Sequence, residues 1–139
     1  MLEGYNGSIM AYGQTSSGKT HTMLGPSIDD EEMKGIIPRM VGGIFGKIES
    51  APEDIEFTVK VSFIEIYNEK IRDLLDPKKN DLKVRERKDK SIYVNDMTES
   101  YVGSEDEVFS LLKIGNENRS IGVTDMNSQS SRSHSVFIL

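Results

Sequence analysis

The sequence contains an eight-residue motif, Gly13-Gln14-Thr15-Ser16-Ser17-Gly18-Lys19-Thr20, which fits the pattern G-x-x-x-x-G-K-S/T. An apolar run at residues 8–12 predicts a buried strand before it, and a candidate helix begins at Lys19. A strand before and a helix after are the context that the motif requires. We therefore interpret residues 13–20 as a phosphate-binding P-loop, because a chance match is expected in well under ~1% of chains of this size.

Phosphate chemistry explains the residue types in this loop. Its two glycines let the backbone curl, so that successive N–H groups point at phosphate oxygens. Lys19 supplies a cation to the β- and γ-phosphates, and the Thr20 hydroxyl is a ligand for Mg²⁺. The helix that follows adds the positive end of its dipole. His21 comes next and is placed to stack on a base, although a single histidine more often belongs to an ordinary helix surface.

Hydrophobic periodicity predicts two long elements after the P-loop. Apolar residues recur at helical spacing over residues 37–48, although three glycines weaken this helix. Apolar and polar residues alternate over residues 55–63, which predicts the clearest strand of the sequence. The phase changes at Ile64 and Ile66, as expected where a strand is covered on both faces.

Shorter patterns complete the predicted fold. Residues 68–75 have the pattern of a short helix, and weak strand patterns follow at 82–84 and 92–94. Ser104 and Glu107 form a capping box that opens a further helix. Strands alternate with helices, which predicts an α/β fold: a P-loop NTPase-type layered sheet with helices on both faces. We expect this sheet to be incomplete, because the chain begins and ends inside predicted strands.

Composition and charge limit the classes of protein. The 139 residues suffice for one domain. They include no cysteine, which is compatible with a cytosolic protein, and carry a net charge of −6, which argues against non-specific nucleic-acid binding. No apolar run reaches the ~20 residues of a membrane span, so no membrane insertion is expected. Residues 78–90 differ, with seven cations and three anions. On charge alone, this segment is best interpreted as a solvated hairpin.

A second polar segment, residues 127–134, holds four serines, an arginine and a histidine. Composition alone predicts an ordinary polar loop. In a protein with a P-loop, hydroxyls are suited to sense a γ-phosphate and to place the attacking water, since each hydroxyl can donate and accept. Arg132 is then available to pair with a carboxylate elsewhere in the protein.

The two polar segments together resemble the kinesin motor superfamily. Residues 4–23 match the kinesin P-loop region, and the pattern N-x-x-S-S-R-S-H at residues 127–134 matches the kinesin switch I. Three stretches between them also match in the family's order, at residues 35–39, 64–69 and 71–75. The resemblance covers nearly the whole chain, and its character is that of conventional, kinesin-1-like motors.

This resemblance implies a microtubule-stimulated ATPase that couples ATP hydrolysis to movement. It implies ATP and Mg²⁺ as cofactors, with Thr20 and Ser131 toward the metal and His21 against the adenine. Ser130 and Ser131 would contact the γ-phosphate with support from Asn127, and Arg132 would form the ion pair that closes the two switches. The complete set of residues carried over is Gly13, Gln14, Thr15, Ser16, Ser17, Gly18, Lys19, Thr20, His21, Asn127, Ser130, Ser131 and Arg132.

The resemblance also gives the basic segment a partner. A hairpin at about residues 78–94 would lie on β-tubulin, with Lys79, Arg85 and Lys90 as exposed contacts to its acidic surface. The motor would be cytoplasmic and associated with the microtubule cytoskeleton. No nucleic acid is expected as a partner, and regions for oligomerisation are expected outside this segment.

Several family features are expected outside residues 1–139. They are the first strand with its R-x-R-P element, the D-x-x-G switch II with the helix that follows it, and the neck. We therefore interpret the chain as the central part of a motor domain and expect the isolated segment to be inactive. Two alternatives stay open: a kinesin-like microtubule-binding protein without ATP turnover, and an unrelated P-loop enzyme such as a small-molecule kinase or a GTPase. The intact P-loop and Ser130-Ser131 pair argue against the first, and the lack of an N-K-x-D motif argues against a GTPase.

Overall fold

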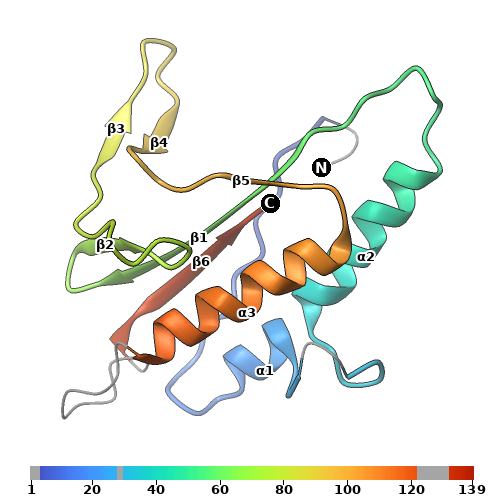
Figure 1. Ribbon diagram of the computed structural model, residues 1–139. Coiled ribbons are helices and arrows are strands. Elements are labelled where there is room, and N and C mark those ends of the chain that lie inside the picture. Colours follow the sequence, from blue (N-terminus) through green and yellow to red (C-terminus); the bar gives the residue numbers. More distant parts are fainter. Residues whose placement is uncertain (1–3, 28–29, 122–131) are drawn as a thin grey trace. The chain divides into compact units, whose positions relative to one another are not determined.

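The computed structural model describes residues 4–27, 30–121 and 132–139. The chain divides into two compact units, Met1–Phe57 and Thr58–Leu139, which are described separately (Figure 1). The first unit holds the P-loop and two helices, and the second holds the strands and the third helix. None of the helices in the described ranges has the length and apolar character needed to cross a lipid bilayer.

Two helices form the first unit, α1 (Lys19–Leu24) and α2 (Ile36–Glu49). Helix α1 begins after Gly18, where φ is 89°, and ends before Gly25, where φ is 85°. These positive φ values favour glycine, which has no Cβ to clash with the backbone. Helix α2 forms as the apolar spacing predicts. Pro38 is tolerated because it lies in the first turn, where backbone N–H groups have no partner within the helix.

The strand predicted at residues 8–12 is wrong. The structure has no regular element there, and Ile9, Met10 and Tyr12 are exposed, Tyr12 at 97%. An apolar run supplies side chains for a strand, but a strand also needs a neighbour for its backbone hydrogen bonds. No strand in the described part of the chain pairs with these residues. An irregular segment therefore precedes the P-loop.

Strand β1 (Val59–Tyr67) is the centre of the second unit. It pairs antiparallel with three strands, β2 (Lys70–Asp73), β5 (Ser100–Val102) and β6 (His134–Ile138). Its central residues, from Val61 to Glu65, are all buried, which confirms the predicted cover on both faces at Ile64, while Ile66 is half-buried. The strand begins later than predicted, because Ile55 and Phe57 are exposed and lie before it.

The short helix predicted at residues 68–75 is wrong, since the chain makes a β-hairpin there. Asn68 and Glu69 have φ values of 49° and 60° and form a two-residue turn between β1 and β2. Asparagine adopts left-handed backbone more readily than most residues, which favours this turn. An isolated helix of this length is unstable in water, whereas β2 gains backbone hydrogen bonds from the edge of β1.

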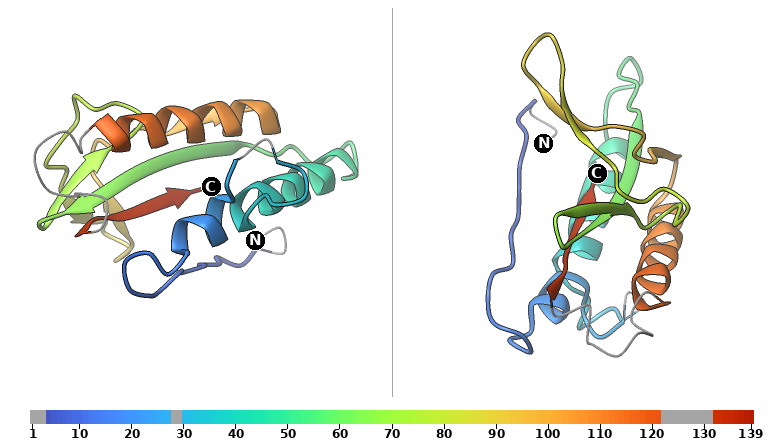
Figure 2. Two further views of the ribbon diagram at one scale, coloured as in Figure 1. Left: turned by 90° about the horizontal axis from the view of Figure 1, so that it is seen from below. Right: turned by 90° about the vertical axis from the view of Figure 1, so that its left-hand side faces the viewer.

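Helix α3 (Glu105–Ile121) packs along β1, as Figure 2 (left) shows. The predicted capping box forms in part: the Glu107 N–H donates to Ser104 Oγ (3.3 Å), and Glu107 Oε2 accepts from the Gly103 N–H (2.7 Å). Val108 and Leu112 on the inner face of the helix have no exposed surface. Burial of this apolar stripe against the sheet stabilises the helix more than its intrinsic propensity does.

A second, two-stranded sheet projects from this unit (Figure 1). It consists of β3 (Val84–Glu86) and β4 (Ile92–Val94), with Arg85 opposite Tyr93. Both weak strand patterns are thereby confirmed as strands, the first shifted by two residues toward the C-terminus. The basic segment is a hairpin, and β3 is exposed along its whole length.

Candidate functional site

The P-loop, residues 13–20, closes onto its own lysine. Lys19 Nζ donates hydrogen bonds to the carbonyl oxygens of Gly13 (2.8 Å) and Gln14 (2.7 Å). The Ser17 N–H donates to the Gln14 carbonyl oxygen (3.2 Å), which makes a tight turn through Ser16, where φ is 65°. The ammonium group is therefore held against the backbone of the loop that the motif defines.

The two glycines of the motif are required for different reasons. A Cβ at Gly13 would lie 2.5 Å from Ser17 Oγ, so a side chain there would push the turn open. Gly18 has open space around it, but its φ of 89° lies in the left-handed region that favours glycine. Both positions fit the tight path that brings the chain from the turn into α1.

The donor set of this loop suits a polyphosphate. It contains one cation, Lys19, no acidic side chain, and four hydroxyls from Thr15, Ser16, Ser17 and Thr20, all at exposed residues. Hydroxyls and a lysine are donors that phosphate oxygens accept, and a threonine hydroxyl is also a ligand for Mg²⁺. Within the described ranges, no group of three or more His, Cys, Asp or Glu side chains is placed to hold a metal ion.

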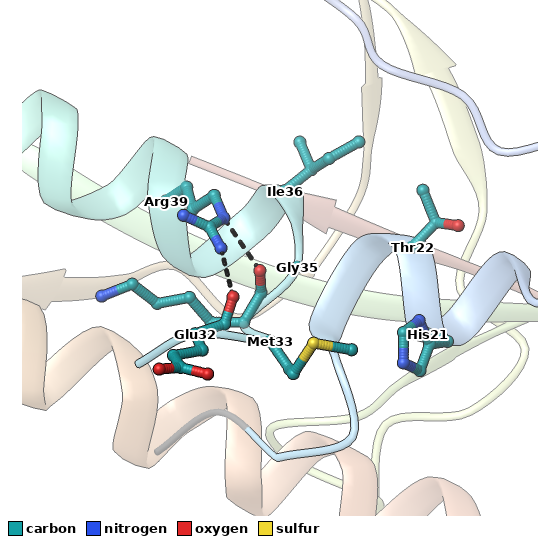
Figure 3. A pocket seen from close by; sticks show the side chains of 8 residues that line it. His21, Thr22, Glu32, Met33, Gly35, Ile36 and Arg39 are labelled. Carbon is teal, nitrogen blue, oxygen red and sulfur yellow. Dashed lines mark hydrogen bonds between the residues drawn. The ribbon is translucent and has the colours of Figure 1, made fainter. Parts of the chain in front are cut away.

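A hollow of about 270 Å³ lies beside α1 within the first unit (Figure 3). Arg39 links two other residues that line this hollow, because its guanidinium donates to the carbonyl oxygens of Glu32 (2.8 Å) and Lys34 (2.9 Å). A Cβ at Gly35 would lie 2.5 Å from the Leu24 nitrogen, so glycine permits the close approach of the two segments. The lining residues are His21, Thr22, Glu32, Met33, Lys34, Gly35, Ile36 and Arg39. The contact of His21 with an adenine stays a prediction.

A second polar cluster, which we call the Glu65 cluster, consists of Glu65, Arg72, Arg119 and Ser133. Glu65 lies in the middle of β1 and is 2% exposed. Its Oε2 accepts a hydrogen bond from Arg72 Nη2 (2.6 Å). Its Oε1 accepts from Ser133 Oγ (2.7 Å) and from Arg119 Nε (3.2 Å). Burial of a lone carboxylate is strongly unfavourable, and these charged and hydroxyl donors remove that penalty.

Sequence reasoning assigned no role to Glu65, Arg72 or Arg119. One signal was present, because a glutamate between two isoleucines, where the strand is covered on both faces, must find buried partners. The partners themselves were not identifiable, since they lie 7, 54 and 68 residues away along the chain.

The predicted switch I residues fall into two groups. Asn127, Ser130 and Ser131 lie outside the described residues, so their roles stay predictions. Arg132 is described and exposed, and its predicted ion pair also stays a prediction. Ser133 belongs to the Glu65 cluster.

The basic hairpin presents some of its predicted contacts and not others. Arg85 and Lys90 are exposed, as expected for residues that meet a partner. Lys79 is half-buried and donates to Thr98 Oγ1 (3.0 Å), so the expectation that it is an exposed contact is wrong. The stem of this lysine is partly covered, and its hydrogen bond to Thr98 braces the base of the hairpin.

Hydrogen bonds lower the pKa values of two carboxyl groups of the hairpin, those of Asp81 and Asp89. A hydrogen bond from Lys83 Nζ (2.8 Å) lowers the pKa of Asp81 below its usual value. Hydrogen bonds from Ser91 lower the pKa of Asp89 in the same way. The positive field of this hairpin is therefore partly offset by its own carboxylates at neutral pH.

Known proteins with similar sequences are kinesin heavy chains. The kinesin heavy chain of Syncephalastrum racemosum is 56% identical over 133 residues, which cover 96% of this chain and 14% of that protein. The kinesin heavy chain of Caenorhabditis elegans is 55% identical over 139 residues, which cover all of this chain and 17% of that protein. Human kinesin-1 heavy chain is 56% identical over the whole chain, again across 14% of its own length. The chain thus spans between a seventh and a sixth of the length of these relatives.

This chain is also similar to a solved kinesin structure. It is described as that of a fast kinesin, with implications for its ATPase mechanism and its interactions with microtubules. It is 50% identical, superposes with a TM-score of 0.94, and is matched over 98% of this chain and 38% of that one. This match confirms the predicted P-loop NTPase-type fold. The family model of the kinesin motor domain matches residues 1–139, and the chain therefore belongs to the kinesin motor domain family.

Proposed function

We propose that this chain forms the ATP- and Mg²⁺-binding part of a microtubule-stimulated ATPase that moves along microtubules. The observation that carries the proposal is the P-loop geometry, in which Lys19 Nζ is held against the carbonyl oxygens of Gly13 and Gln14. Family membership supports the motor activity. The chain spans 14–17% of its curated relatives, so the activity is proposed for the complete motor domain.

In this proposal each P-loop residue has a defined task. Lys19 brings its charge to the β- and γ-phosphates, and its two carbonyl hydrogen bonds keep the ammonium group positioned before the nucleotide arrives. Thr20 is exposed, and its hydroxyl would hold Mg²⁺, which would supply positive charge beside the phosphates. Fixed donors of this kind stabilise developing charge without reorganisation during the reaction.

The remaining assignments extend the same proposal. Asn127, Ser130 and Ser131 sense the γ-phosphate and place the attacking water, Ser131 also lies toward the metal, and Arg132 closes the switches. The exposed cations Arg85 and Lys90 support binding of the hairpin to the acidic surface of a microtubule. Such a protein works in the cytoplasm on the microtubule cytoskeleton.

One experiment separates this function from the alternatives. We expect the complete motor domain to bind ATP tightly and to hydrolyse it slowly, with a rate that rises when microtubules are added. Microtubule binding without turnover would identify a non-catalytic relative. Turnover that microtubules leave unchanged would identify a P-loop enzyme of another kind. Steady-state ATPase and co-sedimentation assays on the same preparation give both results.

A further inference from the structure

We propose that Glu65 and Ser133 are positioning residues for switch I, residues 127–134. The buried Glu65 carboxylate bonds to Arg119, which precedes switch I in the chain, and to Ser133, which lies near its end. This inference rests on the proposed function, because it assumes that switch I acts on the γ-phosphate.

The same carboxylate oxygen holds both flanks. Arg119 lies in the last turn of α3, which ends at Ile121, and its Nε donates to Glu65 Oε1 (3.2 Å). Ser133 lies directly before β6, and its Oγ donates to the same oxygen (2.7 Å). Arg119 Nη2 also donates to Ser133 Oγ (3.2 Å). The end of α3 and the start of β6 are therefore joined to one atom and to each other.

The Glu65 carboxylate that joins them cannot rotate freely. Glu65 is in the buried centre of β1, and its second oxygen is held by Arg72 from β2 at 2.6 Å. Rotation of the carboxylate would break a charge-assisted hydrogen bond on one oxygen or the other. The pairing of Ile66 with His134 also fixes where β6 begins relative to β1. Backbone register and the side-chain cluster thus constrain the same point of the chain.

Precise placement matters for the chemistry proposed here. Phosphoryl transfer depends on the positions of groups around the γ-phosphate, and a shift of about 1 Å is enough to lower a rate strongly. Loss of the Ser133 hydroxyl would release one flank from Glu65 without removing a group that contacts nucleotide. Such a change should slow the chemical step and leave nucleotide binding nearly unchanged.

The test is Ser133→Ala in the complete motor domain. We expect kcat to fall about tenfold, while the KM for ATP and the dissociation constant for ADP stay within about twofold. Ser133→Thr keeps the hydroxyl, so it should restore kcat to within about threefold of the unmodified protein. Thermal unfolding of both variants, measured in parallel, shows that the fold is retained.

Ser120→Ala is the matched control, because it removes a hydroxyl one residue from Arg119. Ser120 is exposed, and its Oγ donates to the Asn116 carbonyl oxygen of its own helix (2.9 Å), so kcat should not change. An unchanged kcat in Ser133→Ala, or an equal loss of kcat and ADP affinity, would overturn the positioning role. If Lys19→Ala is inactive at the same time, the proposed function stands and only this inference fails. An active Lys19→Ala would instead remove the proposed function.

Discussion

The P-loop and the Glu65 cluster are held in different ways. Among the residues that the structure describes, Lys19 bonds only to carbonyl oxygens five and six residues before it, within a loop that is mostly exposed. Glu65 is buried and joins β1 to β2, α3 and the residue before β6. Two hydrogen bonds in an exposed loop contribute little to stability, whereas removal of one partner from a buried charge network is strongly destabilising. We therefore expect substitutions in the loop to change activity alone, and substitutions that disturb packing around the sheet to change stability, with or without a change in activity.

The largest effect is expected for Lys19→Ala in the complete motor domain. Lys19 is the only cation in the P-loop. Because phosphoryl transfer depends on electrostatic stabilisation, kcat should fall by at least ~10³. The free energy of unfolding should change by no more than about 0.5 kcal/mol, because both hydrogen bonds are local and close to solvent.

Single-turnover ATP hydrolysis and chemical denaturation check this prediction. Lys47→Ala is the control, because Lys47 is an exposed cation in α2 outside the P-loop. A Lys19→Ala protein that is both inactive and strongly destabilised would remove the contrast between the two regions.

A stability effect is expected in the second unit for Gly115→Ala. Gly115 in α3 faces Phe63, and a Cβ there would lie 2.7 Å from Cε1 of that ring. Overpacking of this kind costs about 1–3 kcal/mol, which exceeds the gain of about 1 kcal/mol from alanine's better helix propensity. Phe63 also packs edge-to-face on Phe137 of β6, so its ring has little room to move.

Gly43→Ala is the matched change in the first unit. Gly43 is an exposed residue of α2, so a methyl group there should raise the free energy of unfolding by about 0.5–1 kcal/mol. Urea denaturation of the two variants gives the comparison directly. Equal stabilisation by both substitutions would show that the α3–β1 contact is looser than the structure indicates.

Local requirements explain which parts of the molecule the sequence predicted. The P-loop was recognisable because Gly13, Gly18 and Lys19 act within one short segment. The α2 helix and the Ser104 cap likewise depend on neighbours a few residues away. The burial of β1 was visible because its phase changes where both faces are covered.

The errors come from pairing partners that hydrophobic periodicity does not identify. Residues 68–75 carry apolar spacing that fits a helix, but the edge of β1 decides that they form a hairpin. Residues 8–12 lack a partner strand among the described residues, which an apolar run cannot reveal. The role of Glu65 depends on Arg119 and Ser133, which only the folded chain brings together.

Substitutions in the basic hairpin test whether the exposure of a residue, rather than the unit that contains it, determines whether its replacement changes activity or stability. Arg85 and Lys90 belong to the second unit but are exposed, so their replacement should affect binding and not stability. We expect Arg85→Gln with Lys90→Asn to weaken microtubule affinity about fivefold at low salt, since each exposed ion pair contributes roughly 0.2–1 kcal/mol. The affinity should also depend less on salt concentration. Asparagine is chosen at Lys90 because φ is 67° there.

Lys79→Gln provides the contrast within the same hairpin. Its hydrogen bond to Thr98 braces the base of the hairpin, so this change should lower the free energy of unfolding by about 1 kcal/mol. Co-sedimentation at several salt concentrations, with thermal unfolding of the same proteins, separates the two effects. A double variant with unchanged affinity at low salt would identify the hairpin as a solvated surface.

The smallest effect is expected at the turn that the sequence misassigned. Glu69 has a φ of 60°, and left-handed backbone costs a residue other than glycine about 1–2 kcal/mol. Glycine removes that strain but loses about 0.5–1 kcal/mol through the entropy of the unfolded chain. Glu69→Gly should therefore stabilise the second unit by about 0.5 kcal/mol, as expected for an Asn-Gly turn. Lys70→Gly, one residue later in β2, is the control and should destabilise the protein, because glycine weakens a strand interior. Chemical denaturation of both variants measures the effect. If both lose the same free energy of unfolding, the turn carries no strain, and the pairing of β2 with β1 alone selects the hairpin over the helix.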